Sequence, residues 1–90
     1  MKAVLIRGKL IKLDEEDYHL VGNYRWCLNK GKENLSWYVV RGKRVNKKLI
    51  RVFLHRVVAG AKPGDRVSFI GNDTLDMRKK NLRKNGKRLI

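Results

Sequence analysis

The sequence is short of cysteine, proline, acidic residues and long apolar runs. Cys27 is the one cysteine, so no intrachain disulfide can form, and no Cys or His residues stand at the spacing that holds zinc. No stretch approaches the roughly 20 apolar residues of a membrane span, which predicts a protein without membrane contact. Asp and Glu total 8 against 23 Lys and Arg, and this net charge of +15 favours a polyanionic partner, nucleic acid above all.

The basic residues are unevenly placed along a chain whose length predicts one domain with one modest core, residues 1–90. No acidic residue lies between Glu33 and Asp65, and none follows Arg78. Clusters of Lys and Arg of this kind neutralise phosphates and release counterions. From Lys84 onward a solvated tail is the alternative. The residues that we expect to bind nucleic acid are Arg41, Lys43, Arg44, Lys47, Lys48, Arg51, Arg56, Arg78, Lys79, Lys80, Arg83 and Lys84.

Short runs of β-branched and aromatic residues predict the strands of the first two thirds of the chain. Residues 4–6 and 10–13 flank a glycine and predict a strand pair or one bent strand. Large apolar residues alternate in residues 24–28 and return in residues 36–41, which predicts two more strands. Residues 49–55 alternate over the longest stretch and predict the longest strand.

A cluster of four acids predicts a short helix after the first strands. Asp14 has the character of an N-cap, and the acids that follow it favour the positive end of the helix dipole. Leu13 and Tyr18 take the two positions of a hydrophobic staple. We expect a two-turn helix that ends at Gly22 and Asn23. A metal site is the alternative use of the acids, but capping explains all four without a metal.

The polar segments 29–34 and 42–48 predict loops between these strands. Trp26 and Trp37 are expected in the core, with a base-stacking platform as the alternative for each. His55 is expected to tie the sheet to a following short helix or turn, with phosphate contact as the alternative.

Turn residues divide the last third of the chain from the rest. Residues 62–65, Lys-Pro-Gly-Asp, predict a tight turn. Residues 66–70 then predict a strand and residues 71–73 a second turn. Asp76 is expected to cap a helix over residues 75–82, because two leucines seven residues apart would share one of its faces.

The segment from Val67 to Arg83 resembles the ββα-metal unit of HNH endonucleases of the phage and homing type. The resemblance is carried by Val67, Ile70, Thr74, Leu75, Asp76, Arg78, Asn81, Leu82 and Arg83. Segments 10–18, 24–26 and 54–61 are similar, in order and spacing, to the half that precedes the nuclease motif in phage and mobile-element members. In that half the family's sheet is of the kind found in plant ethylene-response-factor-type DNA-binding domains, whose strands carry basic residues to the major groove.

The two positions that carry the chemistry in the family are degenerate in this chain. An acidic or Asn metal ligand and a His general base are replaced by Ser68 and Phe69. A phenyl ring cannot accept a proton from water, and a neutral hydroxyl is a poor sole anchor for a hard divalent cation. The resemblance therefore implies descent without activity: no catalytic residue, no metal and no cofactor are expected, and Phe69 is free to pack against apolar neighbours.

The expected fold is α+β: a small antiparallel sheet with one N-terminal helix over residues 1–61, followed by a ββα-metal-like hairpin and helix over residues 62–90. The expected function is non-catalytic binding of double-stranded DNA. RNA as the ligand and a phage-encoded module that binds a host protein or defence enzyme are alternatives. We expect a cytoplasmic protein, nucleoid-associated or present in a phage-infected cell, and a homodimer would lengthen the binding site.

An active nuclease with a displaced metal site is a further alternative. It would use Asp73, Asp76 or Asn81, although capping and turn formation account for both acids and no histidine is nearby in the sequence.

Overall fold

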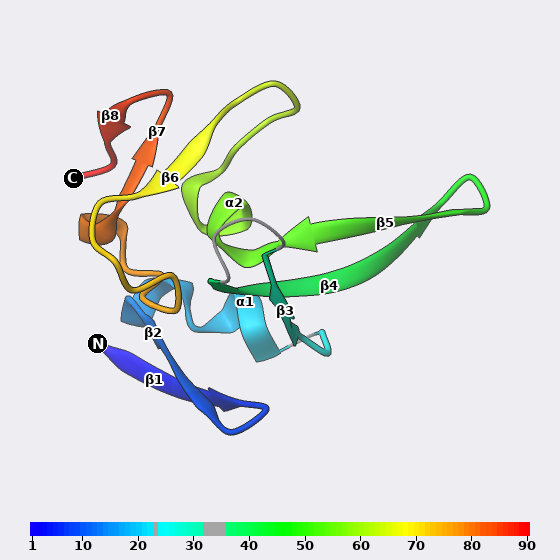
Figure 1. Ribbon diagram of the computed structural model, residues 1–90, viewed down its shortest axis with the longest axis horizontal. Coiled ribbons are helices and arrows are strands. Elements are labelled where there is room, and N and C mark those ends of the chain that lie inside the picture. The colour runs from blue at the N-terminus through cyan, green and yellow to red at the C-terminus, as the bar shows by residue number, and fades with distance from the viewer. Residues whose placement is uncertain (23, 32–35) are drawn as a thin grey trace.

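The computed structural model describes residues 1–22, 24–31 and 36–90 and has the expected α+β fold, with three small antiparallel sheets (Figure 1). The sheets have the strand orders β1-β2, β3-β4-β5 and β6-β7-β8. Their strands are β1 (Lys2–Ile6), β2 (Lys9–Leu13), β3 (Cys27–Lys30), β4 (Trp37–Val45), β5 (Lys48–Phe53), β6 (Val67–Phe69), β7 (Leu82–Lys84) and β8 (Lys87–Arg88). The helices are α1 (His19–Gly22) and α2 (Leu54–Ala59), and 3-10 turns lie at Glu15–Asp17 and Lys79–Asn81. None of the helices in these ranges is long and apolar enough to cross a membrane.

The first two strands form the expected strand pair. β1 and β2 pair with Val4 opposite Ile11, and the turn between them places Arg7 and Gly8 at positive φ. Ile11 is fully buried, whereas Leu5 on the other face of the hairpin is 67% exposed. Because successive side chains of a strand point to opposite faces, one face of this hairpin lies against the core and the other faces solvent.

The expected N-terminal helix is present and ends at Gly22 as expected, but it is shorter than the expected two turns. A 3-10 turn at Glu15–Asp17 is followed by the short helix α1, and Asp14 makes no capping hydrogen bond through its side chain. Its carboxylate instead accepts the backbone N–H of Lys79, at 3.0 Å. Tyr18, the expected staple partner of the buried Leu13, is 46% exposed and is not part of the buried cluster. A long-range contact competes with the local cap for the same carboxylate. The expected end at Asn23 lies outside the described residues.

The expected loop over residues 42–48 is wrong, because β4 and β5 run through it as a long hairpin. Pairing extends from Val40 opposite Phe53 to Val45 opposite Lys48, and Asn46 and Lys47 turn the chain at φ of 52° and 67°. Two residues at positive φ are the geometry of a tight hairpin turn. β4, with 9 residues, is the longest strand, a place that the sequence assigned to residues 49–55.

The next segments follow the expected order with shifted boundaries. β5 stops at Phe53, and α2 follows directly, ends at Ala59 and is capped by Gly60 with φ of 65°. The turn at residues 62–65 is confirmed, since the N–H of Asp65 donates to the carbonyl of Lys62 at 3.0 Å. In the expected loop over 29–34, residues 29 and 30 belong to β3, and residues 32–34 lie outside the described residues.

The expected C-terminal helix over residues 75–82 is wrong. A 3-10 turn at Lys79–Asn81 leads straight into β7, where Leu82 pairs with Phe69. The spacing of Leu75 and Leu82 fits a helix, but Leu82 instead lies in a strand that pairs with β6. β7 then forms a hairpin with β8 through Asn85 and Gly86, both at positive φ.

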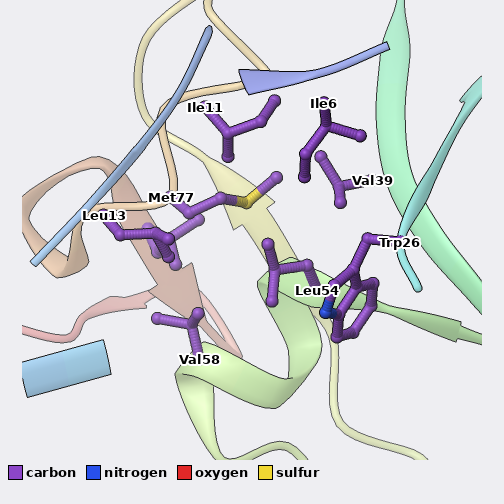
Figure 2. Close-up of a cluster of buried hydrophobic side chains, with 9 residues drawn as sticks. Ile6, Ile11, Leu13, Trp26, Val39, Leu54, Val58 and Met77 are labelled. Atoms are coloured by element: carbon purple, nitrogen blue, oxygen red, sulfur yellow. The ribbon is translucent and has the colours of Figure 1, made fainter. Parts of the chain in front are cut away.

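The core gathers apolar side chains from all three sheets and from α2. Figure 2 shows these side chains pointing toward one another, with Met77 near the middle of the group. Trp26 is 7% exposed and confirms its expected place, whereas Trp37 is 36% exposed and does not. The buried cluster consists of Ile6, Ile11, Leu13, Trp26, Val39, Leu54, Val58, Met77 and Leu82.

Candidate nucleic-acid interface

The outer part of the β4–β5 hairpin, residues 42–51, projects away from the rest of the molecule (Figure 1). We call this segment the arm. Every residue of the arm is exposed, so none of its side chains contributes to the core. Among the described residues, no carboxylate forms an ion pair with its basic side chains. The arm carries five of the basic residues expected at the interface: Lys43, Arg44, Lys47, Lys48 and Arg51.

Both faces of the arm carry positive charge. Residues that are directly opposite in an antiparallel pair share a face, so Lys43 and Ile50 lie on one side, and Arg44 and Leu49 lie on the other. Leu49 is 74% exposed. A two-stranded ribbon fits the major groove of B-form DNA, and apolar side chains can contact thymine methyl groups there.

Arg41 lies at the base of the arm but does not extend into solvent as its neighbours do. Its guanidinium carbon is 3.8 Å from the centre of the Tyr24 ring and 5.6 Å from that of Trp26. Its Nε is buried and has no hydrogen-bond partner in the described part of the chain. Stacking on these rings holds Arg41 against the body of the protein.

Arg56 has a structural role in the turn after α2. Its Nη1 donates to the carbonyl of Asp65 at 2.6 Å, and its Nη2 donates to the carbonyl of Lys62 at 2.9 Å. Both terminal nitrogens therefore fix the turn. These bonds hold the Arg56 guanidinium on the turn, although Arg56 lines the same open hollow as Lys43 and Arg51 of the arm.

Arg78 and Lys79 are paired with acidic residues of the protein itself. Arg78 donates from Nε and Nη2 to the two oxygens of Asp76, at 2.8 and 2.6 Å. These bonds lower the pKa of Asp76 and raise that of Arg78. The Lys79 ammonium lies 2.7 Å from Glu16 and 3.3 Å from Asp17, which raises its pKa. These pairs offset the charge of both cations, so each attracts a phosphate less than an unpaired basic side chain of the arm does.

The acidic cluster at the start of the chain holds this lysine. Carboxylate oxygens of Asp14, Glu16 and Asp17 lie within 4.8 Å of one another, a grouping that could also hold a metal ion. In the structure, Lys79 supplies its ammonium to two of these residues and its backbone N–H to the third. The cluster thus ties the N-terminal part of the chain to the segment before β7.

The other expected residues form a second basic surface on the β7–β8 hairpin and the turn before it. Lys80 is exposed, and Arg83 and Lys84 are half-buried. Arg83 pairs with Arg88, and Lys84 pairs with Lys87. Like charges directly opposite each other destabilise a sheet, so an anion that bridges them would be stabilising.

The two degenerate positions lie on opposite faces of β6. Ser68 is exposed and pairs with Arg83, so a basic side chain shares its face. A cationic neighbour disfavours a metal ion there. Phe69 packs as expected: its ring centre lies 4.9 Å from that of His55 and 6.3 Å from that of Tyr38. His55 is buried, and burial followed by the charge of Arg56 lowers its pKa to about 4. Its ring is therefore neutral near pH 7.

The residues of the displaced-site alternative also have internal partners. The Asn81 side chain accepts the N–H of Gly71 at 2.9 Å and donates to the carbonyls of Asp73 and Asp76 at 3.2 and 3.0 Å. Asp73 accepts the N–H of Leu75 at 3.0 Å. With Asp76 bound to Arg78, all three residues hold the segment between β6 and β7 in place.

Two exposed lysines that the sequence did not assign to the interface lie around Trp37. The Nζ atoms of Lys9 and Lys30 lie 5.6 and 5.7 Å from the centre of its ring. Lys30 is the register partner of Trp37 on β3. The sequence predicts strands over residues 24–28 and 36–41 but not their register, and it is the register that places Lys30 opposite Trp37.

The arm and the β7–β8 surface are the parts of the described chain where expected interface residues gather without forming ion pairs with carboxylates. Arg41, Arg56, Arg78 and Lys79 are held by other contacts. This division rests on geometry alone. Comparisons of the chain with protein-family models, with curated proteins and with solved structures found no match.

Proposed function

We propose that the protein is a non-catalytic nucleic-acid-binding protein that binds double-stranded DNA through its arm. The observation that carries this proposal is the arm itself, a projecting two-stranded ribbon with five exposed basic residues and no carboxylate paired to them among the described residues. Basic side chains on such a ribbon neutralise phosphates and release counterions, which supplies most of the binding free energy.

The β7–β8 hairpin supports the same proposal. Its opposed Arg83 and Arg88, and its opposed Lys84 and Lys87, place like charges side by side. Phosphate groups would relieve this repulsion. Contacts of this kind position a protein on the backbone, whereas the exposed Leu49 of the arm is suited to an apolar contact with base edges.

The proposed lack of catalysis rests on Ser68 and Phe69 and on the resemblance to HNH endonucleases. Ser68 shares a face with Arg83, which opposes a cation, and Phe69 packs against His55. Proton transfer needs a titratable group at the position that this phenyl ring occupies in the proposed scaffold.

The proposal is tested by gel shift of a labelled duplex of about 20 base pairs at several NaCl concentrations, with and without Mg²⁺ or Mn²⁺. We expect a shift that weakens steeply with salt and leaves the duplex intact. Metal-dependent cleavage would contradict the non-catalytic assignment. Absence of a shift near 50 mM NaCl would contradict duplex binding, and a labelled RNA hairpin in the same assay would show whether RNA is the ligand.

Two charge-matched variants localise the interface. The arm variant changes Lys43, Arg44 and Lys48 to Gln, and the control variant changes Lys2, Arg25 and Lys62 to Gln. All six residues are exposed, and each variant loses two Lys and one Arg. If the three arm residues contact phosphates, the slope of log affinity against log salt falls in magnitude by about 2 to 3 in the arm variant alone. Equal losses in both variants would show general charge attraction rather than binding by the arm.

A further inference from the structure

Trp37 is an exposed aromatic ring at the start of β4, far along the strand from the turn of the arm. Its side chain is 36% exposed, in contrast to the buried Trp26. The hydroxyl of Thr74 donates to its backbone carbonyl, which fixes the beginning of the strand. An exposed tryptophan on a fixed backbone presents a large flat surface at little cost in conformational entropy.

The surroundings of this ring are cationic. Lys9, from β2, and Lys30, from β3, bring their ammonium groups within 5.6 and 5.7 Å of its centre. Among the residues that the structure describes, neither lysine forms an ion pair with a carboxylate. The electron-rich face of the ring attracts each ammonium group. A phosphate group near them would be attracted by both.

An open hollow of about 500 Å³ lies beside the ring. It is lined by Arg7, Lys9, Cys27, Leu28 and Trp37. Arg7 contributes a third cation and donates to the Cys27 sulfur at 3.7 Å. The hollow thus combines a flat aromatic wall with positive charge at its edge, the combination that binds a base and its phosphate in single-stranded nucleic acid.

We propose that Trp37 is a stacking platform for an unpaired base, with Lys9 and Lys30 binding the adjacent phosphates. Inside a duplex, both faces of each base are covered by its neighbours, so a side chain stacks on a base most readily in a single strand. This inference rests on the proposed nucleic-acid binding and adds that the protein binds a single-stranded segment. Along β4 the ring lies about 26 Å from the turn of the arm, so one nucleic acid with paired and unpaired parts could contact both.

Tryptophan fluorescence tests the proposal directly, because Trp26 and Trp37 are the two tryptophans of the chain. In a Trp26→Phe variant, all tryptophan emission comes from Trp37. We expect oligo(dT) or oligo(U) of about 12 nucleotides to quench this emission, and a blunt duplex of equal length to leave it nearly unchanged. Quenching by either single strand supports the platform and shows whether DNA, RNA or both can use it. Quenching by neither, or equal quenching by the duplex, overturns the proposal.

A substitution in the otherwise native chain keeps the test independent of the Trp26 variant. Trp37→Leu retains an apolar side chain and removes the stacking surface. We expect the affinity for single-stranded oligonucleotides to fall roughly 5- to 150-fold, with no change in the thermal midpoint or in duplex affinity.

Tyr18→Leu is the matched control. Tyr18 is also exposed and has an ammonium group 5.7 Å from its ring, that of Lys2, but acidic residues precede it in the sequence. We expect this variant to bind single strands like the native protein. If the native protein shifts the duplex but Trp37→Leu leaves single-strand affinity unchanged, the platform is wrong and the proposed function stands. If the native protein does not shift the duplex, the proposed function fails by itself.

Discussion

His55 is a buried titratable residue inside a group of aromatic rings. The ring centres of Tyr38, Phe53 and Phe69 lie 6.0, 5.7 and 4.9 Å from its own. Its Nδ1 is buried without a hydrogen-bond partner among the described residues. Burial disfavours the charged form of the ring and, with the nearby charge of Arg56, lowers its pKa from 6.5 to about 4. The folded protein therefore binds this proton less readily than the unfolded chain does.

The pKa of His55 predicts that stability falls on mild acidification. Between about pH 6.5 and pH 4 the unfolded chain binds the His55 proton and the folded protein does not, so the free energy of unfolding decreases as the pH falls. We expect a loss of about 1 to 2.5 kcal/mol between pH 7 and pH 4.5. Urea unfolding at several pH values measures it. The pKa values of Asp65 and Asp76 are also lowered, from an ordinary value of 3.8, so these two groups change the stability mainly at a pH below this window.

His55→Phe separates this effect from other titrations. The variant keeps an aromatic ring beside Phe69 and should lose most of the dependence of stability on pH between 4.5 and 7. His19→Gln is the control, because His19 is exposed and should leave that dependence in place. An unchanged pH dependence in His55→Phe would show that another group is responsible.

At the scale of elements, the arm is separate from what holds the fold together. Residues 42–51 are all exposed, and the buried cluster takes Val39 from β4 and no residue from the arm. Arg41 and Val52, which pair across the two strands next to the arm, are partly buried. Binding and stability therefore depend on different parts of one hairpin.

This separation predicts that the arm can be removed without unfolding the protein. Replacing residues 42–51 by Asn-Gly would join Arg41 to Val52 through a two-residue turn. Arg41 and Val52 are a register pair of the same hydrogen-bonding type as Val45 and Lys48, which flank the present turn, so the shortened hairpin can keep the same turn geometry. We expect duplex affinity to fall at least about 100-fold at moderate salt, because five phosphate-binding side chains are lost. The thermal midpoint, followed by circular dichroism, should change by less than about 5 °C. A large loss of stability would show that the arm supports the fold.

The sequence predicted elements well where local pattern decides, and poorly where distant contacts decide. The strand pair at 4–6 and 10–13 and the turn at 62–65 follow from alternation and turn residues. The helix expected at 75–82 fails because Leu82 pairs with Phe69 on β6, a contact that no local pattern contains. The basic residues of the arm were identified, but their position in a hairpin was missed, because a run rich in Lys, Arg and Gly resembles a loop.

The same reason explains which expected interface residues are held elsewhere. Arg56 and Lys79 are indistinguishable from Arg51 and Lys80 in a sequence rich in both types. Their partners are the Lys62 and Asp65 carbonyls for Arg56, and acids more than 60 residues away for Lys79. Such partners are visible only in the folded chain.

At the scale of the whole molecule, the acids serve the fold and leave the surplus of positive charge on the surface. In residues 1–22, 24–31 and 36–90, each acidic side chain has a partner within the protein. These residues are Asp14, Glu15, Glu16, Asp17, Asp65, Asp73 and Asp76. Among the described residues, none of these carboxylates forms an ion pair with a basic side chain of the arm or of the β7–β8 hairpin, although Asp65 accepts a hydrogen bond from Asn85 in the turn of that hairpin. Self-repulsion of the net charge of +15 therefore opposes the folded state.

This repulsion predicts that salt and polyanions stabilise the protein. Raising NaCl from about 20 to about 300 mM shortens the range of charge repulsion, and the thermal midpoint should rise by a few degrees. A duplex at saturating concentration should raise it further at low salt, because a ligand that prefers the folded state stabilises it by mass action. The variant with Lys43, Arg44 and Lys48 changed to Gln should start from a higher midpoint at low salt and gain less from both additions. A midpoint that falls with NaCl would mean that the internal ion pairs of Asp76 and Lys79 outweigh the surface repulsion, and the surplus charge would then carry no cost to folding.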